Sequence, residues 1–265
     1  MENSSDIKNI VILGAGSVAT HLALALDMHG YSIKQIYSRT TGSAEMLSLK
    51  TKSEFITNVE QLDKDADLYI IALRDSVVEC LIRKLFVSGI VVHTSGTLPM
   101  SVLENMSTRY GVFYPLQTFS KSRPIRFDHI PVCLEASDEP SLKAIRQVAE
   151  NLSDQIYEIN SEQRQYIHLA AVFSCNFSNF MYVAAADVLK SRNIDFDILV
   201  PLIREFFDKV TMMEPWDAQT GPAIREDKGT IKKQLELLDK FPEYKEIYRQ
   251  ITEKIIERKR KETNP

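Results

Sequence analysis

The stretch that decides the fold is Lys8-Asn9-Ile10-Val11-Ile12-Leu13-Gly14-Ala15-Gly16-Ser17-Val18-Ala19. An apolar run of strand length ends at Gly14 and a helical apolar period begins at Val18, so the glycines lie where a parallel strand turns into a helix. Gly14 permits the tight turn, Gly16 lets a pyrophosphate approach the backbone, and Ala19 allows close packing of helix on strand. The free N–H groups of a helix N-terminus bind anions. We therefore predict a dinucleotide-binding turn made of Gly14, Ala15, Gly16, Ser17, Val18 and Ala19; the alternative is a tight turn with no ligand.

The composition is that of an ordinary soluble protein. With 265 residues, of which 44% are hydrophobic, the chain is long enough for one large domain or two. A formal net charge of −4 gives no basic field, so we expect no nucleic-acid partner. Residues 1–6 lack the apolar core of a secretion signal, and no apolar run approaches the roughly eighteen residues of a membrane span. We expect a cytoplasmic protein that does not bind a membrane.

The three cysteines, Cys80, Cys133 and Cys175, are odd in number and widely separated. They form no C-x-x-C pair, so neither a disulfide framework nor a structural zinc is indicated, and we expect no metal site. Because each is flanked by apolar residues, all three are expected to be core residues.

The second strand, predicted over 33–37, leads into a loop that indicates which dinucleotide is bound. An NAD site places Asp or Glu at the end of this strand, about twenty residues past the glycines, to bind the ribose 2′-hydroxyl. Here Ser38 stands at that position and is followed by Arg39 and Thr40. A guanidinium binds phosphate oxygens in bidentate fashion and the hydroxyls add donors, which favours the 2′-phosphate of NADP. The alternative is that Arg39 is an exposed loop residue.

The pattern that follows is typical of a doubly wound, mainly parallel Rossmann sheet. The apolar run 68–73 lacks polar alternation, as a strand covered by helices on both faces requires. We predict eight strands within 7–159, with the later ones near 54–56, 68–73, 90–93, 112–119, 131–135 and 155–159, and a helix over 138–152. The loops at the carboxyl edge are expected to line the cofactor crevice, with Leu73 and Arg74 in one and Thr94, Ser95 and Gly96 in another. His93, at the end of the fifth strand, is either a satisfied core histidine or a catalytic one.

The remainder predicts an all-α second domain. From Ser161, a candidate helix cap, nothing breaks the helical pattern until about Lys190, a length of roughly 45 Å at 1.5 Å per residue. Further helices are predicted over 196–213, 230–240 and 242–261. We therefore divide the chain into a Rossmann domain over 1–159 and a helical substrate and dimerisation domain over 160–265. Because the long helix carries apolar residues on most faces, we expect a homodimer.

The long helix also carries candidate catalytic residues. At 3.6 residues per turn, His168, Asn176 and Asn179 share one stripe. Proton transfer during reduction of a carbonyl or imine needs a donor near pH 7, which suits His168, and Asn176 can hydrogen-bond the substrate. The alternative is that these are buried polar groups satisfied by the other domain. Arg225, as a carboxylate clamp, and Lys228, as an acid, form a second candidate pair.

Several motifs together resemble one group of proteins. They are Gly14-x-Gly16-x-x-Ala19, His93-Thr94-Ser95-Gly96, Tyr114-Pro115-Leu116-Gln117-Thr118-Phe119, the run from His168 to Phe177, and Thr220-Gly221-Pro222 with Arg225 and Asp227. The chain is similar to a family that joins a Rossmann-like domain to a helical domain of unknown function. That family resembles pyrroline-5-carboxylate reductase and, more distantly, the 6-phosphogluconate dehydrogenase superfamily, whose helical C-terminal domain the second domain is expected to share.

The resemblance implies an NADP-dependent oxidoreductase with a helical, dimer-forming C-terminal domain. We place Gln117, Asn179 and Arg225 on the substrate side. Two positions depart from the pattern: Tyr114 stands where relatives often carry His, which removes a candidate base, and Glu226 stands where glycine is usual. The expected reaction is hydride transfer between the nicotinamide and a small carbonyl, imine or hydroxy acid. The alternative is a non-catalytic dinucleotide-binding sensor or regulatory module, because Rossmann domains also serve as binding domains.

Overall fold

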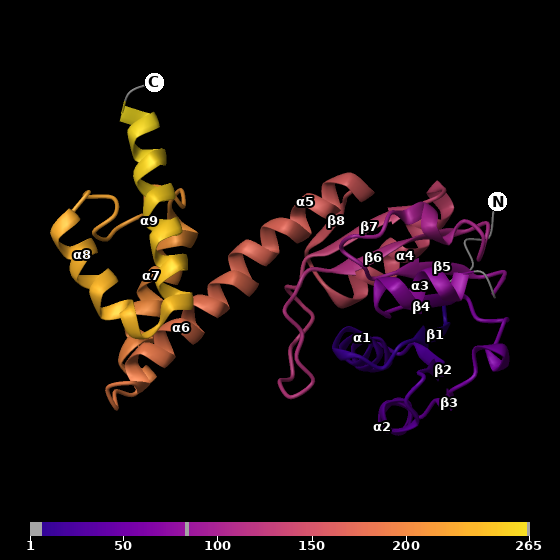
Figure 1. Ribbon diagram of the computed structural model, residues 1–265. Coiled ribbons are helices and arrows are strands. Elements are labelled where there is room, and N and C mark those ends of the chain that lie inside the picture. The colour runs from indigo at the N-terminus through magenta and orange to yellow at the C-terminus, as the bar shows by residue number, and fades with distance from the viewer. Residues whose placement is uncertain (1–6, 83–84, 264–265) are drawn as a thin grey trace. The chain divides into compact units, whose positions relative to one another are not determined.

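The computed structural model describes residues 7–82 and 85–263 (Figure 1). The compositional prediction for residues 1–6 lies outside these ranges. The chain forms two compact units, Met1–Asn176 and Phe177–Pro265, and each is described by itself. The division falls inside the long helix rather than before it, because the first part of that helix packs on the sheet. A domain boundary at 159/160 stays a prediction.

The first unit is built on one eight-stranded sheet in the order β3-β2-β1-β4-β5-β6-β7-β8. Neighbouring strands run parallel, except that β6 and β7 pair antiparallel. This confirms the predicted mainly parallel sheet. The strands are β1 Asn9–Leu13, β2 Ser32–Tyr37, β3 Glu54–Ile56, β4 Leu68–Ile71, β5 Ile90–His93, β6 Tyr110–Pro115, β7 Val132–Ala136 and β8 Ile156–Glu158.

Both faces of the sheet are covered, which explains the continuous apolar runs of its central strands. Along β1, Ile10 and Ile12 join a core with α1 Ser17–Met28, α2 Thr41–Thr51 and α4 Glu139–Leu152. The alternate residues Val11 and Leu13 join a second core on the other face. That core also holds residues of η1 Val59–Gln61, α3 Asp75–Ile82 and η2 Met100–Leu103. Successive side chains of a strand point to opposite faces, so a strand buried on both must be apolar throughout.

The predicted long helix is present, with two differences. It consists of α5 Ser161–Ala171, a π-helical segment η3 Val172–Phe177 and α6 Ser178–Lys190. Its N-cap is Asn160 rather than Ser161, because Asn160 Oδ1 accepts from the Gln163 N–H at 2.9 Å and Gln163 Oε1 accepts from the Asn160 N–H at 3.1 Å. This reciprocal pair is a capping box. The π turn alters the helical period between His168 and Asn179, so the stripe was calculated for a period that this helix does not keep throughout, and it stays a prediction.

By length and composition alone, the helix 161–190 is apolar enough to cross a membrane. This corrects the sequence-based statement that no apolar run approaches that length. One such helix is weak evidence of a membrane span. Its first turn carries Arg164, whose side chain is fully buried in an ion pair with Glu135 of β7. The helix therefore begins as part of the packed α/β unit.

The second unit consists of helices with few buried side chains. They are α6, η4 Phe196–Leu199, α7 Val200–Met212, α8 Lys228–Leu237, η5 Leu238–Lys240 and α9 Pro242–Thr263. Pro201 lies in the first turn of α7, where a helix tolerates proline. Among the described apolar residues of this unit, the buried ones are Ala218 and Ala223. Large apolar side chains of η4 and α7 are exposed instead.

The cysteines differ from the prediction. Cys133 of β7 is buried, as expected, but Cys80 and Cys175 are exposed. On α3, Val78 and Leu81 face the core, which leaves Cys80 on the outer side. Apolar neighbours in sequence were thus a poor guide to burial on a helix, where adjacent residues point in different directions.

Candidate functional site

The two glycines of the turn after β1 have different surroundings. Gly14 adopts a φ of +134°, and a Cβ there would lie 2.3 Å from the carbonyl oxygen of Ala72, at the end of β4. Gly16 is the N-cap of α1 and makes no side-chain cap bond. Apart from Gly16, its chain neighbours and the nearby backbone of α1, no atom of the described residues lies within 4 Å of the place that a Gly16 Cβ would take. The turn therefore leaves open space directly before a helix N-terminus with free N–H groups, which fits a pyrophosphate.

This turn lies at the point where the strand order reverses. β1 pairs with β2 on one side and with β4 on the other. From β1 the chain continues outward through β2 to β3, and from β4 it continues in the opposite direction to β5. In open α/β sheets, ligands bind outside the carboxyl ends of the strands at this switch point. The loops after β1, β4 and β5 all begin at that edge.

A cavity of about 310 Å³ lies between these loops. The residues that line it are Gly16, Ser17 and Val18 after β1, Ala72, Leu73, Arg74 and Asp75 after β4, Thr94, Ser95, Gly96 and Thr97 after β5, and His168 of α5. The fold thus brings His168 to the expected cofactor loops, with all of these residues inside the first unit. A larger cavity of about 470 Å³ lies in the second unit, but none of its described lining residues is charged. We place the candidate site at the smaller cavity because it adjoins the glycine turn and the loops at the switch point of the sheet.

The loop after β5 is held in shape by its own side chains. Ser95 Oγ accepts from the N–H groups of Thr97 and Leu98, each at 3.1 Å. The Thr97 hydroxyl donates to the Asp75 carboxylate at the start of α3, which joins the loops after β4 and β5. One wall of the cavity is therefore fixed before any ligand binds.

His93, at the end of β5, lies in the core of the first unit. Its side chain is fully buried, and its Nδ1 accepts the Ser95 N–H at 3.1 Å. Burial, with a smaller contribution from the Arg164 charge, lowers the pKa of His93 to about 4. The imidazole is therefore neutral at pH 7 and no proton donor. Within the described part of the chain, its Nε2 has no hydrogen-bond partner, so His93 has the burial of the core histidine, one of the two alternatives left open by the sequence, but only one of its ring nitrogens is hydrogen-bonded.

His168 is held between two contacts. The Tyr114 hydroxyl lies 2.9 Å from His168 Nδ1, and the two rings meet edge to face at 71° with centroids 6.1 Å apart. On the cavity side, a Cβ on Gly96 would lie 2.5 Å from both Cγ and Nδ1 of the imidazole. Gly96 therefore lets the loop after β5 pack against the ring. Tyr114, which in the sequence only removed a candidate base, contacts the candidate acid directly.

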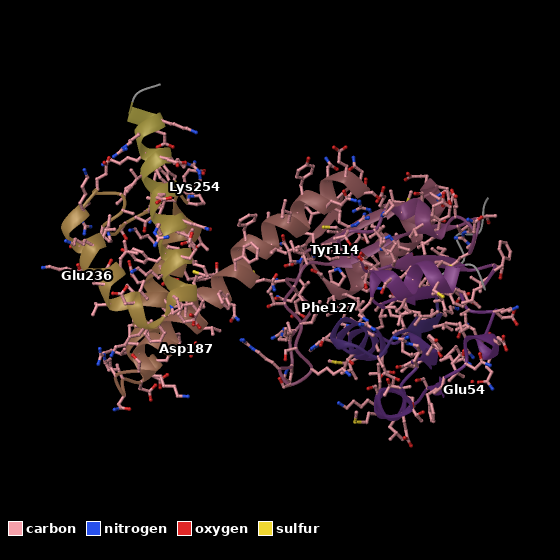
Figure 2. All side chains as sticks on the ribbon, viewed as in Figure 1. Glu54, Tyr114, Phe127, Asp187, Glu236 and Lys254 are labelled. Atoms are coloured by element: carbon pink, nitrogen blue, oxygen red, sulfur yellow. The ribbon has the colours of Figure 1, made fainter. Side chains whose placement is uncertain are left out.

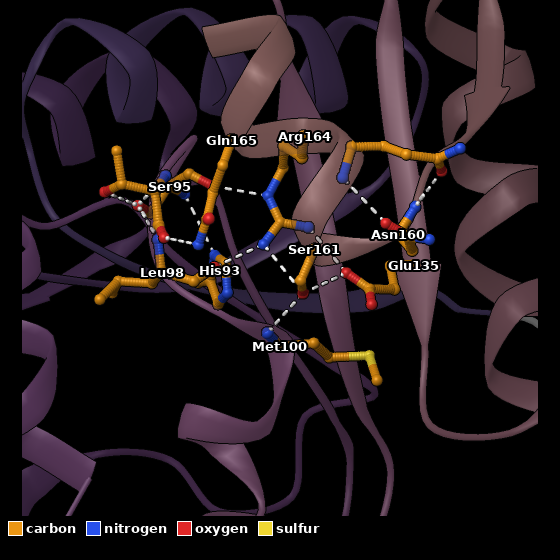
Figure 3. Close-up of polar contacts among 11 residues, drawn as sticks. His93, Ser95, Leu98, Met100, Glu135, Asn160, Ser161, Arg164 and Gln165 are labelled. Atoms are coloured by element: carbon orange, nitrogen blue, oxygen red, sulfur yellow. Dashed lines mark hydrogen bonds and ion pairs between the residues drawn. The ribbon is translucent and has the colours of Figure 1, made fainter. Parts of the chain in front are cut away.

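Arg164 anchors α5 to the sheet, and sequence reasoning missed it (Figure 3). Its Nη1 donates to Glu135 Oε2 at 2.7 Å, and its Nε donates to the Ser95 carbonyl at 3.1 Å. Its Nη2 donates to the Leu98 carbonyl and to Ser161 Oγ. The Ser161 hydroxyl in turn donates to Glu135 at 2.7 Å. The guanidinium thus ties the helix that carries His168 to the loop that carries Gly96. An arginine one turn into an apolar helix was the available signal.

The loop after β2 lies at the expected edge of the sheet but does not line the cavity. The Thr40 N–H donates to Ser38 Oγ at 3.2 Å, and the Ser38 N–H donates to the Ile56 carbonyl at 3.1 Å. Thr40 is the N-cap of α2 without a side-chain cap bond, and Arg39 is exposed. A hydroxyl, a guanidinium and the N–H groups of a helix start are therefore open to an anion here.

The three candidate amides are not gathered at the cavity. Gln117 Oε1 accepts from the N–H of Thr118 at 2.7 Å and from its hydroxyl at 3.2 Å, so this carbonyl is engaged within its own loop. Asn176 is exposed and lies in the π segment. Asn179 is exposed on α6 in the second unit. Their placement at a substrate stays a prediction.

Arg225 and Lys228 lie in the second unit, and both are exposed. Between them, Glu226 adopts a φ of +52°, the left-handed conformation that explains why glycine suits this position. Glu226 also accepts from Arg260 at 2.7 Å and lies 3.8 Å from the Lys259 ammonium. These two cations hold its pKa below the usual range. Glu226 thus adopts a backbone conformation that glycine adopts more easily, and its carboxylate forms an ion pair with α9.

Comparison with known proteins agrees with this architecture. Residues 2–117 match the Rossmann-like domain, and residues 130–255 match a domain of unknown function (DUF2520). The crystal structure of the "putative NADP oxidoreductase BF3122 from Bacteroides fragilis" is 42% identical in sequence. The match covers 96% of this chain and 100% of that chain, with a TM-score of 0.89. The chain belongs to this family of Rossmann-like proteins with a DUF2520 domain. The resemblance drawn from the motifs is confirmed.

Two more distant structures share the fold. An imine reductase from Myxococcus stipitatus, solved in complex with NADP⁺, is 16% identical with a TM-score of 0.65, covering 96% of this chain and 93% of its own. The 1-pyrroline-5-carboxylate reductase of Streptococcus pyogenes is 11% identical with a TM-score of 0.62, covering 94% and 98%. At these identities the likeness concerns the fold alone. Among curated proteins, none matches the sequence.

Proposed function

We propose that this protein is an NADP-dependent oxidoreductase that transfers a hydride between the nicotinamide and a small carbonyl, imine or hydroxy-acid substrate. The observation that carries the proposal is the cavity that brings Gly16 and the loops after β4 and β5 together with the imidazole of His168. The 42% identical relative is named an NADP oxidoreductase, which supports the same cofactor. When bound, NADP supplies or accepts the hydride; the chain provides binding, orientation and the proton.

Each part of the site has a role in this proposal. The turn from Gly14 to Ala19 holds the pyrophosphate against the start of α1. Ser38, Arg39 and Thr40 bind the 2′-phosphate. Leu73, Arg74 and the loop Thr94-Ser95-Gly96 line the nicotinamide side. His168 is the proton donor in reduction.

The assignment of the adenosine end is tested by cofactor preference. NADPH should bind at least tenfold more tightly than NADH, because hydrogen bonds to charged groups contribute about 1.5–3 kcal/mol. Titration calorimetry should show that Arg39→Ala removes this preference by weakening NADPH alone. Lys34→Ala, which removes an exposed cation from β2 outside the loop, is the matched control and should keep it. Equal affinities in the unaltered protein would contradict the assignment.

Substitution of His168 distinguishes an enzyme from a non-catalytic sensor. His168→Ala should lower turnover by roughly 10²–10⁴-fold, the range for a lost general acid, with little change in NADPH affinity. A variant that keeps its specific activity would pass the role of acid to Lys228 or to a bound water. A non-catalytic sensor would bind NADPH and turn over nothing in either form. We also propose that the substrate is bound by Asn176, Gln117, Asn179 and Arg225.

We further propose that the protein is a cytoplasmic homodimer and that 160–265 is the substrate and dimerisation domain. The support is the second unit itself, in which η4 and α7 leave large apolar side chains exposed. Contiguous exposed apolar surface marks an interaction site in soluble proteins. A second copy covers it most simply, because two-fold pairing lets the same surface serve both subunits.

A further inference from the structure

Tyr114 and His168 come together from segments far apart in the chain. Tyr114 lies on β6 (Figure 2). Its exposed fraction is only 8%. His168 is on α5, one residue after Ile167, which packs against the cluster of Val112, Tyr114 and Cys133. The contact is therefore built by the packing of α5 on the sheet, and the network of Arg164 with Glu135 holds that packing in place.

Two contacts determine the position of the His168 imidazole. Nδ1 faces the Tyr114 hydroxyl at 2.9 Å, and the ring lies against the Cα of Gly96, where there is no room for a side chain. Among the described residues, none makes a hydrogen bond to His168 Nε2. One nitrogen of the ring is thus engaged by the protein, and His168 is among the residues that line the cavity.

The phenol can hold Nδ1 in either protonation state of the imidazole. Burial raises the pKa of Tyr114 to about 12, so its hydroxyl keeps its proton at neutral pH. A phenolic hydroxyl both donates and accepts. It can donate to Nδ1 of a neutral imidazole and, after rotation about the C–O bond, accept from Nδ1–H of an imidazolium.

We propose that Tyr114 is a positioning residue that reserves His168 Nε2 for proton exchange with the substrate. This rests on the proposed function. In reduction, the substrate carbon takes the hydride, the electron pair of the C=O or C=N π bond moves to the heteroatom, and that atom takes the proton from Nε2 of the imidazolium. His168 is left neutral with its remaining proton on Nδ1, donated to the Tyr114 oxygen. A solvent proton then restores the imidazolium.

The test replaces the hydroxyl and keeps the ring. In protein labelled with ¹⁵N at histidine, Tyr114→Phe should move the Nδ1 resonance of His168, because this nitrogen loses its hydrogen-bond partner. With NADPH and a panel of a 2-oxo acid, an aldehyde and a cyclic imine, kcat should fall about tenfold on the substrate that is reduced, while its KM and the NADPH Kd stay within twofold. Tyr110→Phe, the same change at the start of β6, is the matched control and should alter neither reading.

The outcomes separate the inference from the function on which it rests. An Nδ1 resonance that does not move, or a Tyr114→Phe enzyme with unchanged kcat, overturns the inference even if the protein is a reductase. If the resonance moves but the unaltered protein reduces nothing in the panel, the assignment of Nδ1 to Tyr114 is supported and the proposed reaction is contradicted. A kcat loss together with an equal loss of thermal stability in Tyr114→Phe, but not in Tyr110→Phe, assigns the hydroxyl a structural role and also overturns the inference.

Discussion

At the scale of single residues, the two glycines of the nucleotide turn should fail in different ways. Gly14→Ala places a Cβ 2.3 Å from a carbonyl oxygen at a φ of +134°, and we expect it to cost about 2–5 kcal/mol of folding free energy. Gly16→Ala meets no atom within 4 Å at a φ of −77°, so its cost should stay within about 1 kcal/mol, that of a poorer N-cap. On the proposed placement of the cofactor, the added methyl group lies where the pyrophosphate binds. NADPH affinity should therefore fall at least tenfold in Gly16→Ala at nearly unchanged thermal stability.

Thermal melting and NADPH titration of both variants make this comparison. A Gly16→Ala protein that binds NADPH as tightly as the original would show that the open space before α1 has another use. A stable Gly14→Ala protein would show that the end of β4 can move away from the turn.

A buried histidine makes stability depend on pH. The folded protein lowers the pKa of His93 from 6.5 to about 4, so between these values the unfolded chain binds a proton that the folded chain does not. Stability from this group is complete above pH 6.5 and is lost as the pH falls toward 4. At about 1.4 kcal/mol per pKa unit, the loss is about 3 kcal/mol.

Urea unfolding at pH 7.5 and pH 4.5 measures this loss. In His93→Asn the amide oxygen can still accept the Ser95 N–H, so the variant should be less stable at pH 7.5 but lose about 2 kcal/mol less on acidification. Met28→Gln, at a position of α1 that is 82% exposed, should lose as much as the original protein. Equal pH dependence in all three proteins would show that His93 does not resist protonation.

At the scale of secondary-structure elements, α5 depends on one buried ion pair. Removing one partner of such a pair leaves an uncompensated charge and typically costs 3–5 kcal/mol. Arg164→Met should therefore destabilise the protein by about that amount and weaken NADPH binding, because the carbonyls of Ser95 and Leu98 lose their donor. Glu135→Met with Arg164→Met should cost less than the sum of the two single changes.

A double-mutant cycle by urea unfolding checks this coupling. The matched control is Arg146 with Glu158, an exposed pair on α4 and β8 for which a coupling below about 1 kcal/mol is expected. Additive effects at Arg164 and Glu135 would mean that the helix is held mainly by its apolar contacts.

The same scale shows what the sequence could predict. The central strands β1, β4 and β5 were predicted because a strand buried on both faces must be continuously apolar, and a short stretch of sequence shows this. The edge strands β3 and β8 are partly exposed and were placed by their position in the α/β pattern. The glycine turn was equally local. The contact between Tyr114 and His168 joins residues 54 positions apart, and it exists only because α5 returns across β6. The π segment Val172–Phe177 was missed because its apolar residues suit an α-helix as well. The sequence could therefore indicate candidate residues within single loops. It could not indicate the contacts between separate elements.

For the whole molecule, the second unit is the part least able to exist alone. Ile198, Leu202 and Phe206 recur every four residues through η4 and α7 and are 67%, 65% and 51% exposed. Residues at this spacing share one face of a helix, so they form a continuous apolar stripe. Leaving it in water would oppose folding of a unit whose own core is small. We expect the stripe to be covered by a second copy of the chain.

Light scattering coupled to gel filtration should give twice the 30.2 kDa mass of the chain at micromolar concentration. Leu202→Asp puts a charge in the middle of the stripe and should shift the protein toward monomer or cause aggregation, since burying an unpaired carboxylate is costly. Leu49→Asp makes the same change at a leucine that is 74% exposed on α2, and it should leave the dimer intact. A monomeric original protein contradicts the proposal. A Leu202→Asp protein that stays dimeric would place the interface on another face of the helices.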